Sequence, residues 1–261
     1  LPAGAPWRAQ AHCSYMAHHP GDVVMSALHT RARIAGLLYV LLAIAAPLRL
    51  LYIPTTLVVR GDPSATAANI AAHEALFRWG IVSDLFVGTI LIFVVLALYR
   101  LLSPVNRSLA VLMVILGGLL PSVIYFLNTV NDAAALALIN GAPYLDVFDK
   151  AQREALALLF LHLHGQVVTA AEWLWGIWLI PLAILVFHSG FLPRFFGVWL
   201  ALNGLAYIAQ CLLGFLAPGY DSGRLDTLFL VLQLGEVAFM LWMLIFGARR
   251  YLFRKTAQER A

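Results

Sequence analysis

Charged side chains are scarce in this chain. Asp, Glu, Lys and Arg make up 11% of its 261 residues, while apolar residues make up 62%. A soluble domain usually has about a quarter charged and about half apolar residues, so this composition excludes an ordinary soluble fold. The net charge of +4 does not indicate nucleic-acid binding, because the basic residues gather at the ends of apolar stretches. We therefore expect a membrane protein whose surroundings are the lipid bilayer, with no nucleic-acid partner.

Cysteine is also scarce, with only Cys13 and Cys211. Two cysteines are too few for a disulfide framework or a structural zinc site. The sequence contains no His-Glu-x-x-His spacing, which would indicate a helical zinc site. We expect no metal and no cofactor.

Long apolar runs, in contrast, fill most of the chain. A helix needs about 20 apolar residues to cross a hydrocarbon core of about 30 Å. The runs are apolar on all sides and do not alternate with polar residues, which favours helices over barrel strands. The sequence therefore predicts an all-α fold, a polytopic bundle of six transmembrane helices over residues 34–58, 79–102, 108–131, 166–188, 195–217 and 226–248.

The remaining segments are short. We expect residues 1–30 to form a disordered or non-native tail, because residues 1–24 lack the apolar core of a signal peptide. Met25 stands just before the first basic residues, and our hypothesis is that translation starts there. Residues 31–250 form the predicted six-span membrane domain, and residues 251–261 a basic cytoplasmic tail. The helical pattern over 149–188 is too long for one simple crossing.

The basic residues predict the orientation. They stand at one set of span ends, whereas Asp62, Asp132 and Asp146 fall in the opposite connections. Cytoplasmic loops carry the excess of Lys and Arg. We expect both termini in the cytoplasm and the protein in the cell's inner (plasma) membrane. The basic residues in question are Arg31, Arg33, Arg100, Arg107, Arg194, Arg249, Arg250, Arg254 and Lys255.

Three acids interrupt the apolar runs: Asp84, Glu172 and Glu236 lie in the second, fourth and sixth predicted spans. A charged residue within hydrocarbon costs about 2.5–3.5 kcal/mol on insertion scales and normally faces the interior of the bundle. One acid in each even span also suggests three helical-hairpin repeats. The alternative is that topology alone places arginines and small residues at similar positions.

Other polar residues share helical seams with these acids, because positions three and four apart lie on one helix face. Arg49 lies at a depth where we expect it to pair with Asp84 or Glu172. His164 points away from the seam that carries His162. The predicted cavity-lining set is Asp84, Glu172, Glu236, Arg49, His162, Asn128 and Gln233. The alternative reading treats these polar side chains as structural hydrogen bonds between helices.

Several short motifs occur in a specific order. They include Ala32-Arg-Ile-Ala-Gly-Leu-Leu-Tyr39, Gly80-Ile-Val-Ser-Asp84, Gly176-Ile-Trp-Leu-Ile-Pro181, Ser189-Gly-Phe-Leu-Pro-Arg194 and Gly235-Glu236. Over about residues 30–248 the chain resembles the uncharacterised prokaryotic integral membrane proteins of domain-of-unknown-function family 4386. The resemblance implies a multi-span membrane domain and brings no activity, cofactor or catalytic residue.

Three functions stay open at this point. The first is a small transporter or ligand-binding membrane protein, whose buried acids line a polar cavity for a small solute or cation. The second is a non-catalytic scaffold or sensor subunit. The third is an intramembrane metal-dependent enzyme that uses His162 or His164 with carboxylates. The sequence leaves the catalytic residues and the oligomeric state undetermined.

Overall fold

The computed structural model describes residues 20–217 and 223–249, and within these ranges the chain forms helices and turns without strands. Short elements connect or extend the main helices: η1 (Leu48–Tyr52), α2 (Ile53–Leu57), α3 (Pro63–Ala72), α5 (Arg107–Val114), η2 (Ile115–Leu119) and η3 (Pro143–Leu145). The main helices are α1 (Pro20–Pro47), α4 (Glu74–Leu102), α6 (Leu120–Ile139), α7 (Lys150–His188), α8 (Arg194–Leu216) and α9 (Gly223–Phe246).

The described residues contain six helical stretches that are long and apolar enough to cross a membrane. Four of them are α4, α7, α8 and the greater part of α9; in the other two, α1 continues through η1 and α2, and α5 continues through η2 and α6. Each corresponds to one predicted run, so the predicted all-α, six-span fold is confirmed. The bounds differ most in α7, which is one continuous helix of 39 residues, about 58 Å long at about 1.5 Å per residue.

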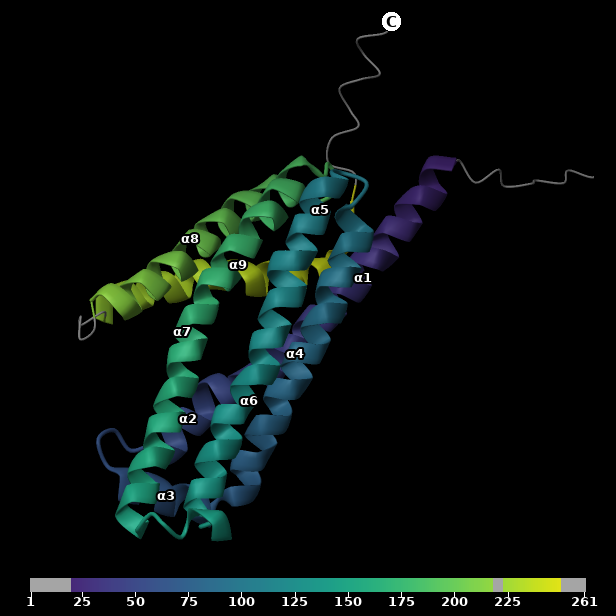
Figure 1. Ribbon diagram of the computed structural model, residues 1–261. Helices are drawn as coiled ribbons and strands as arrows, with labels where there is room; N and C mark the ends of the chain where they lie inside the picture. Colours follow the sequence, from purple (N-terminus) through teal and green to yellow (C-terminus); the bar gives the residue numbers. More distant parts are fainter. Residues whose placement is uncertain (1–19, 218–222, 250–261) are drawn as a thin grey trace, which may run out of the picture.

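The six stretches form a closed ring. Each packs against the next along the chain, in the order α1, α4, α6, α7, α8 and α9, and α9 packs back against α1. Glycines permit the closest approaches. A Cβ on Gly36 of α1 would meet the backbone of Leu244 in α9, and one on Gly176 of α7 would lie 2.6 Å from the carbonyl oxygen of Gly204 in α8. Figure 1 shows α4, α6 and α7 running along the length of the molecule, with α8 and α9 inclined to them.

One end of the ring gathers arginines, and we call it the basic end. Arg31 donates a hydrogen bond to the carbonyl oxygen of Arg100, Arg33 donates one to Leu244, and the Arg249 backbone N–H donates one to Phe191. α1 begins and α9 ends on this side, at the top of Figure 1. α8 and α9 flank only the half of α7 next to it, since Gly214 near the end of α8 packs against Thr169.

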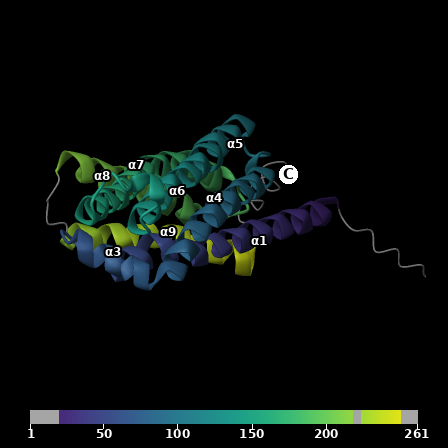
Figure 2. The ribbon, with the colours of Figure 1, turned by 60° about the horizontal axis from the view of Figure 1, so that its bottom comes forward.

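The opposite end is a second layer, which we call the cap. It consists of α2, α3, the start of α4, the end of α6 and the start of α7, and this end of the molecule comes forward in Figure 2. Its own apolar core includes Ile53, Ile70 and Phe77. A larger core around Val94, Leu98 and Leu182 lies on the side of the basic end. Polar side chains lie between the two cores.

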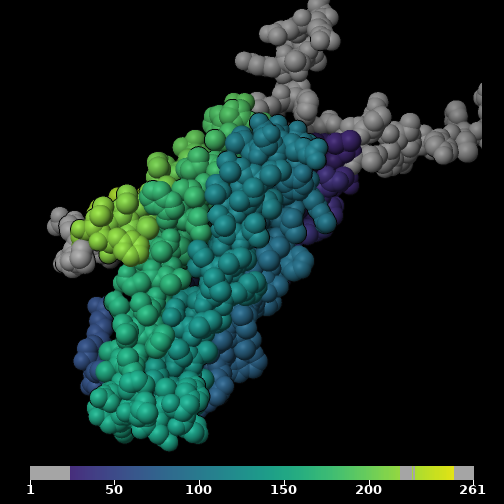
Figure 3. Space-filling model, in the orientation of Figure 1, coloured from purple at the N-terminus to yellow at the C-terminus, as the bar shows by residue number. Residues whose placement is uncertain are grey.

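Most outward-facing positions of the long helices are large and apolar. Examples are Leu127 and Val130 on α6 and Leu230 on α9, each more than half exposed. In Figure 3, the side chains of α4, α6 and α7 form one continuous surface on this face of the molecule. Such a surface is unfavourable in water and suits contact with lipid.

Both turns of π-helix lie beside a proline. η1 begins immediately after Pro47, and η2 ends two residues before Pro121. Proline removes a backbone donor and crowds the preceding turn, and an extra residue in a π-turn relieves that crowding. The helix irregularity before Pro121 thus takes the form of a π-turn. η1 also carries Arg49 into the interior, in agreement with the frequent occurrence of such turns at functional sites.

Polar caps set the helix starts in the cap layer. Asp62 accepts a hydrogen bond from the Ala65 backbone N–H, and this bond lowers the pKa of the exposed Asp62 carboxyl group. Asp149 and Gln152 form a reciprocal capping box at the start of α7, so two of the otherwise unpaired donors of that helix end are satisfied.

The predicted domain bounds are only partly covered. α1 begins at Pro20 and so extends into the segment predicted as a tail. Residues 1–19 and the predicted basic tail at 251–261 lie outside the described residues.

Candidate functional site

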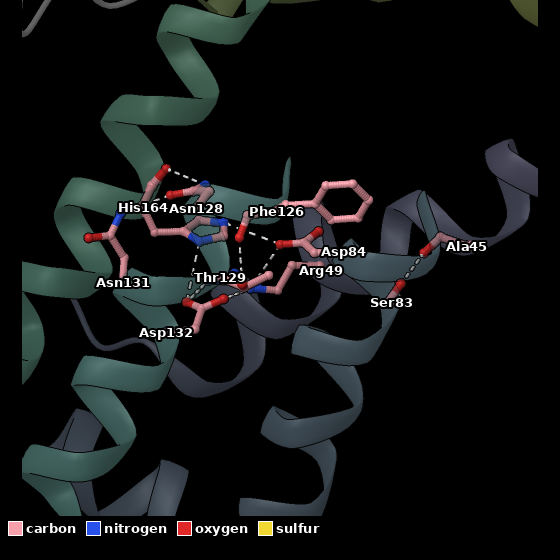
Figure 4. Close-up of polar contacts among 10 residues, drawn as sticks. All are labelled: Ala45, Arg49, Ser83, Asp84, Phe126, Asn128, Thr129, Asn131, Asp132 and His164. Carbon is pink, nitrogen blue, oxygen red and sulfur yellow. Dashed lines mark hydrogen bonds and ion pairs between the residues drawn. The ribbon is translucent and has the colours of Figure 1, made fainter. Parts of the chain in front are cut away.

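Four side chains from four different elements meet between the two apolar cores. Arg49 comes from η1, Asp84 from α4, Asp132 from α6 and His164 from α7. All four are at most 4% exposed, and Asp132 is fully buried. Figure 4 shows the two carboxylates on either side of the guanidinium and imidazole groups. We call this group the charged cluster.

Arg49 and Asp132 form the tightest contact of the charged cluster. Arg49 Nε donates to Asp132 Oδ2 at 3.0 Å, and Arg49 Nη2 donates to Asp132 Oδ1 at 2.5 Å. This two-bond arrangement is the geometry in which arginine binds a carboxylate most strongly. The Asp84 carboxylate lies farther off, 4.0 Å from Arg49 Nε. Arg49 also lies over the ring of Phe77, 5.9 Å from its centre.

His164 bridges the same two carboxylates. Its Nδ1 is 3.3 Å from Asp132 Oδ1, and its Nε2 is 3.9 Å from Asp84 Oδ2. Nδ1 is buried and makes no hydrogen bond of good geometry within the described structure. The imidazole is thus placed between two negative charges while one nitrogen keeps an unused hydrogen-bonding position.

Amide side chains hold the helices around the charged cluster. Asn128 Nδ2 donates to the backbone oxygen of His164 at 3.3 Å, and Asn131 Nδ2 donates to Asn128 Oδ1 at 2.9 Å. On the other side, Ser83 donates to the carbonyl oxygen of Ala45. These bonds join α6 to α7 and α4 to α1, so they fix the distances between the charged groups.

The charge of the cluster is unbalanced. Two ionised carboxylates face one guanidinium, so with neutral His164 the four side chains carry one net negative charge. An uncompensated charge in a buried site is costly. One proton on His164, or one bound cation, makes the sum zero.

A metal ion is one cation to consider. One ligand atom each from Asp84, Asp132 and His164 lie within 4.8 Å of one another. However, Arg49 already binds both oxygens of Asp132, and a divalent ion there would bring its charge against the guanidinium. The geometry therefore suits a proton better than a metal.

A large cavity borders the charged cluster. Its volume is about 830 Å³, and it lies between η1, α2 and the first half of α7. Apolar side chains such as Ile53, Val58 and Phe77 form part of its wall. None of the described residues that line it is acidic, and its polar lining consists of Arg49, Arg60, His162, His164, Gln166 and Thr169.

A second polar group lies nearer the basic end. Glu236 of α9 accepts a hydrogen bond from the Tyr39 hydroxyl and another, at 3.1 Å, from Asn203 Nδ2. Gln233, one turn away, donates to Gln210 of α8. Glu172 of α7 is partly buried, and among the described residues no ion pair joins it or Glu236 to a basic side chain.

The structure therefore divides the predicted cavity-lining set. Arg49, Asp84 and Asn128 belong to the charged cluster or its surroundings, while Glu236 and Gln233 belong to the second group. His162 lines the large cavity and is exposed. Arg49 does lie within ion-pair distance of Asp84, at 4.0 Å, as one of the two expected pairings has it. Its closer partner is Asp132, which the prediction leaves out.

Two residues of the charged cluster, Asp132 and His164, are absent from the predicted cavity-lining set, although His164 is named in the metal-dependent enzyme alternative. The sequence prediction ends the third span at residue 131 and so places Asp132 in a connection. In the structure, α6 continues to Ile139. The predicted set leaves out His164 because the prediction assigns it to a different helix face from His162 and Glu172. A signal for Asp132 was present: the apolar run Ala-Ala-Ala-Leu-Ala-Leu-Ile follows it directly.

The closed ring of six long apolar helices, with a cluster of buried charged groups in its interior, defines a multi-pass integral membrane protein. Its family is shown by comparison with known families. The chain belongs to the family described as domain of unknown function DUF4386, whose family model matches residues 34–247. No curated protein and no solved structure matches the chain significantly.

Proposed function

We propose that this protein is a small proton-coupled transporter for organic anions. The observation that carries the proposal is the charged cluster, with its single unbalanced negative charge, at the wall of a cavity whose polar lining is basic. Intramembrane ionisable residues of this kind typically mark substrate pathways and proton relays.

The cavity supports the class of solute. Arg49 and Arg60 supply positive charge, and His162, Gln166 and Thr169 supply further hydrogen-bonding groups. The apolar wall accepts a carbon skeleton. A carboxylate, sulfonate or phosphate that binds Arg49 competes with Asp132 for the guanidinium, since arginine binds all these anions through the same pair of N–H groups.

The charged cluster supports the coupling. When an anion draws Arg49 away, the two carboxylates keep a larger share of uncompensated negative charge. Protonation of His164, which faces Asp84 and Asp132, then compensates that charge. Anion and proton therefore favour each other's binding, as binding linkage requires.

We place the basic end in the cytoplasm, since cytoplasmic ends carry the excess of arginine. The cap and the large cavity then face the opposite side of the membrane, and the solute enters from there.

The test is uptake into proteoliposomes under an inward proton gradient. The probes are succinate, citrate, phosphate and benzenesulfonate, all of which cross a plain bilayer poorly. We expect the uptake of at least one probe to exceed its uptake into protein-free liposomes. We expect His164→Gln to abolish the dependence of this uptake on the proton gradient. The matched control is His188→Gln, which changes an exposed histidine of the same helix at the basic end.

Two results would overturn the proposal. If none of the four anions accumulates, a scaffold or sensor explains the buried charges better. If Zn²⁺ or Mn²⁺ raises the melting temperature of the wild type and not of His164→Gln, the site is a metal centre, as expected for an intramembrane enzyme.

A further inference from the structure

A second, aromatic cavity lies within the ring, on the side of the charged cluster nearer the basic end. Its volume is about 140 Å³. It is lined by five aromatic side chains and one carboxylate: Tyr39, Tyr125, Trp175, Trp178, Tyr207 and Glu236. We call it the aromatic cavity. The proposed anion pathway does not use it.

The aromatic rings come from four helices. Tyr39 of α1 lies 6.4 Å from Trp178 of α7, measured between ring centres. Trp175 of α7 stands between Tyr125 of α6, at 6.3 Å, and Tyr207 of α8, at 5.7 Å. These contacts fix the ring orientations, so the walls of the cavity are preorganised.

The single carboxylate of the aromatic cavity comes from the fifth helix, α9. Tyr39 and Asn203 hold Glu236 in place by donating to its two oxygens. Within the described part of the chain, no arginine, lysine or histidine forms an ion pair with it. Glu236 is partly buried within an apolar bundle, and a carboxylate in such surroundings without a cationic partner favours neutralisation by a proton or by a bound cation.

The lining determines which cation fits. Hard metal ions prefer six or more oxygen ligands, and this cavity offers one carboxylate among aromatic rings and aliphatic side chains. Aromatic faces attract organic ammonium groups, with a gain of about 0.5–2 kcal/mol for each cation–π contact. We propose that the aromatic cavity binds an organic ammonium ion, with Glu236 as its counter-ion.

An adjoining cavity supplies the entrance. It has a volume of about 280 Å³ and shares Tyr39, Leu42, Tyr207 and Glu236 with the aromatic cavity. Its remaining lining includes Leu230, Leu234 and Val237 of α9, all exposed on the lipid-facing side. The ligand therefore reaches Glu236 sideways, between α1 and α9, from within the bilayer. A cation with apolar substituents meets both requirements.

The test measures binding to the full chain in lipid nanodiscs by isothermal titration and by the fluorescence of Trp175 and Trp178. The probes are benzyltrimethylammonium, choline and 3,3-dimethylbutan-1-ol, the uncharged isostere of choline. We expect benzyltrimethylammonium to bind more tightly than choline, and choline about tenfold more tightly than the alcohol. Equal affinity of choline and the alcohol for the wild type contradicts the proposal without any variant.

Variants locate the binding site. We expect Glu236→Gln and Trp175→Leu each to weaken the binding of benzyltrimethylammonium about tenfold or more. Glu172→Gln is the matched control, since Glu172 is a partly buried acid of the bundle that does not line the aromatic cavity. A folded Glu236→Gln protein, judged by its gel-filtration profile, that binds as the wild type does overturns the proposal. Anion uptake is measured separately, so failure of one proposal leaves the other intact.

Discussion

Asp132 accepts both of the hydrogen bonds through which Arg49 is held in the interior. Removal of one partner from a buried ion pair costs about 3–5 kcal/mol, and the remaining carboxylate, Asp84 at 4.0 Å from Arg49 Nε, is too distant to replace the two hydrogen bonds. We expect Asp132→Asn to lower the free energy of unfolding by about this amount, measured by denaturant titration in detergent.

The control for this prediction is an ion pair of the same kind at the surface. Arg78 and Glu74 lie 2.6 Å apart on α4, with Arg78 59% exposed. Exposed pairs contribute about 0–1 kcal/mol, so Glu74→Gln should change the stability little. Equal losses in the two variants would show that burial is not what makes the Arg49 pair important.

At the scale of the element, α7 and α8 are joined by close backbone contact. A Cβ added at Gly176 would lie 2.5 Å from a side-chain carbon of Ile208, whereas one added at Gly165 would meet nothing within 4 Å. We expect Gly176→Ala to destabilise the protein by about 1–3 kcal/mol through overpacking.

Gly165→Ala is the matched control, because it makes the same change in the same helix. Alanine is favoured over glycine inside a helix by up to about 1 kcal/mol, so this variant should melt at an unchanged or slightly higher temperature. A loss of stability at Gly165 as large as that at Gly176 would refute the assigned helix contact.

The elements also show what could be predicted from the sequence. The six spans follow from hydrophobic length, which the bilayer imposes directly. The face of a residue on a long helix is harder to predict. At about 100° per residue, His162 and His164 lie about 80° on either side of Glu172, so helix geometry gives no reason to prefer His162, which the prediction assigns to the seam of Glu172. The packing of α6 against α7 makes that choice, and it depends on tertiary structure.

At the scale of the molecule, the two ends of the ring differ in charge, and this difference predicts their accessibility. Val147, in the connection that joins α6 to α7 at the cap end, is 83% exposed, and Thr30 lies near the basic end on the exposed side of α1. In a cysteine-free background with Cys13→Ser and Cys211→Ala, we expect Val147→Cys to react with an impermeant maleimide in intact cells.

Thr30→Cys should react only after the membrane is permeabilised, because the basic end faces the cytoplasm in the proposed orientation. The ratio of labelling before and after permeabilisation is the measurement. The reverse pattern would invert the topology and place the large cavity on the cytoplasmic side.

Leu50, Tyr125 and Trp175 line the aromatic cavity and also a cavity of about 10 Å³ beside Asp84 and His164. These three side chains therefore separate the aromatic cavity, which borders Glu236, from the small cavity, which borders Asp84 and His164. We expect that a rotation of Tyr125 or Trp175 that enlarges one of these cavities narrows the other. An occupant that moves either ring on one side changes the affinity on the other, and by the same factor in both directions. If the aromatic cavity binds an ammonium ion as proposed, we expect its affinity for that ion to change when Asp84 or His164 in the neighbouring cavity is substituted.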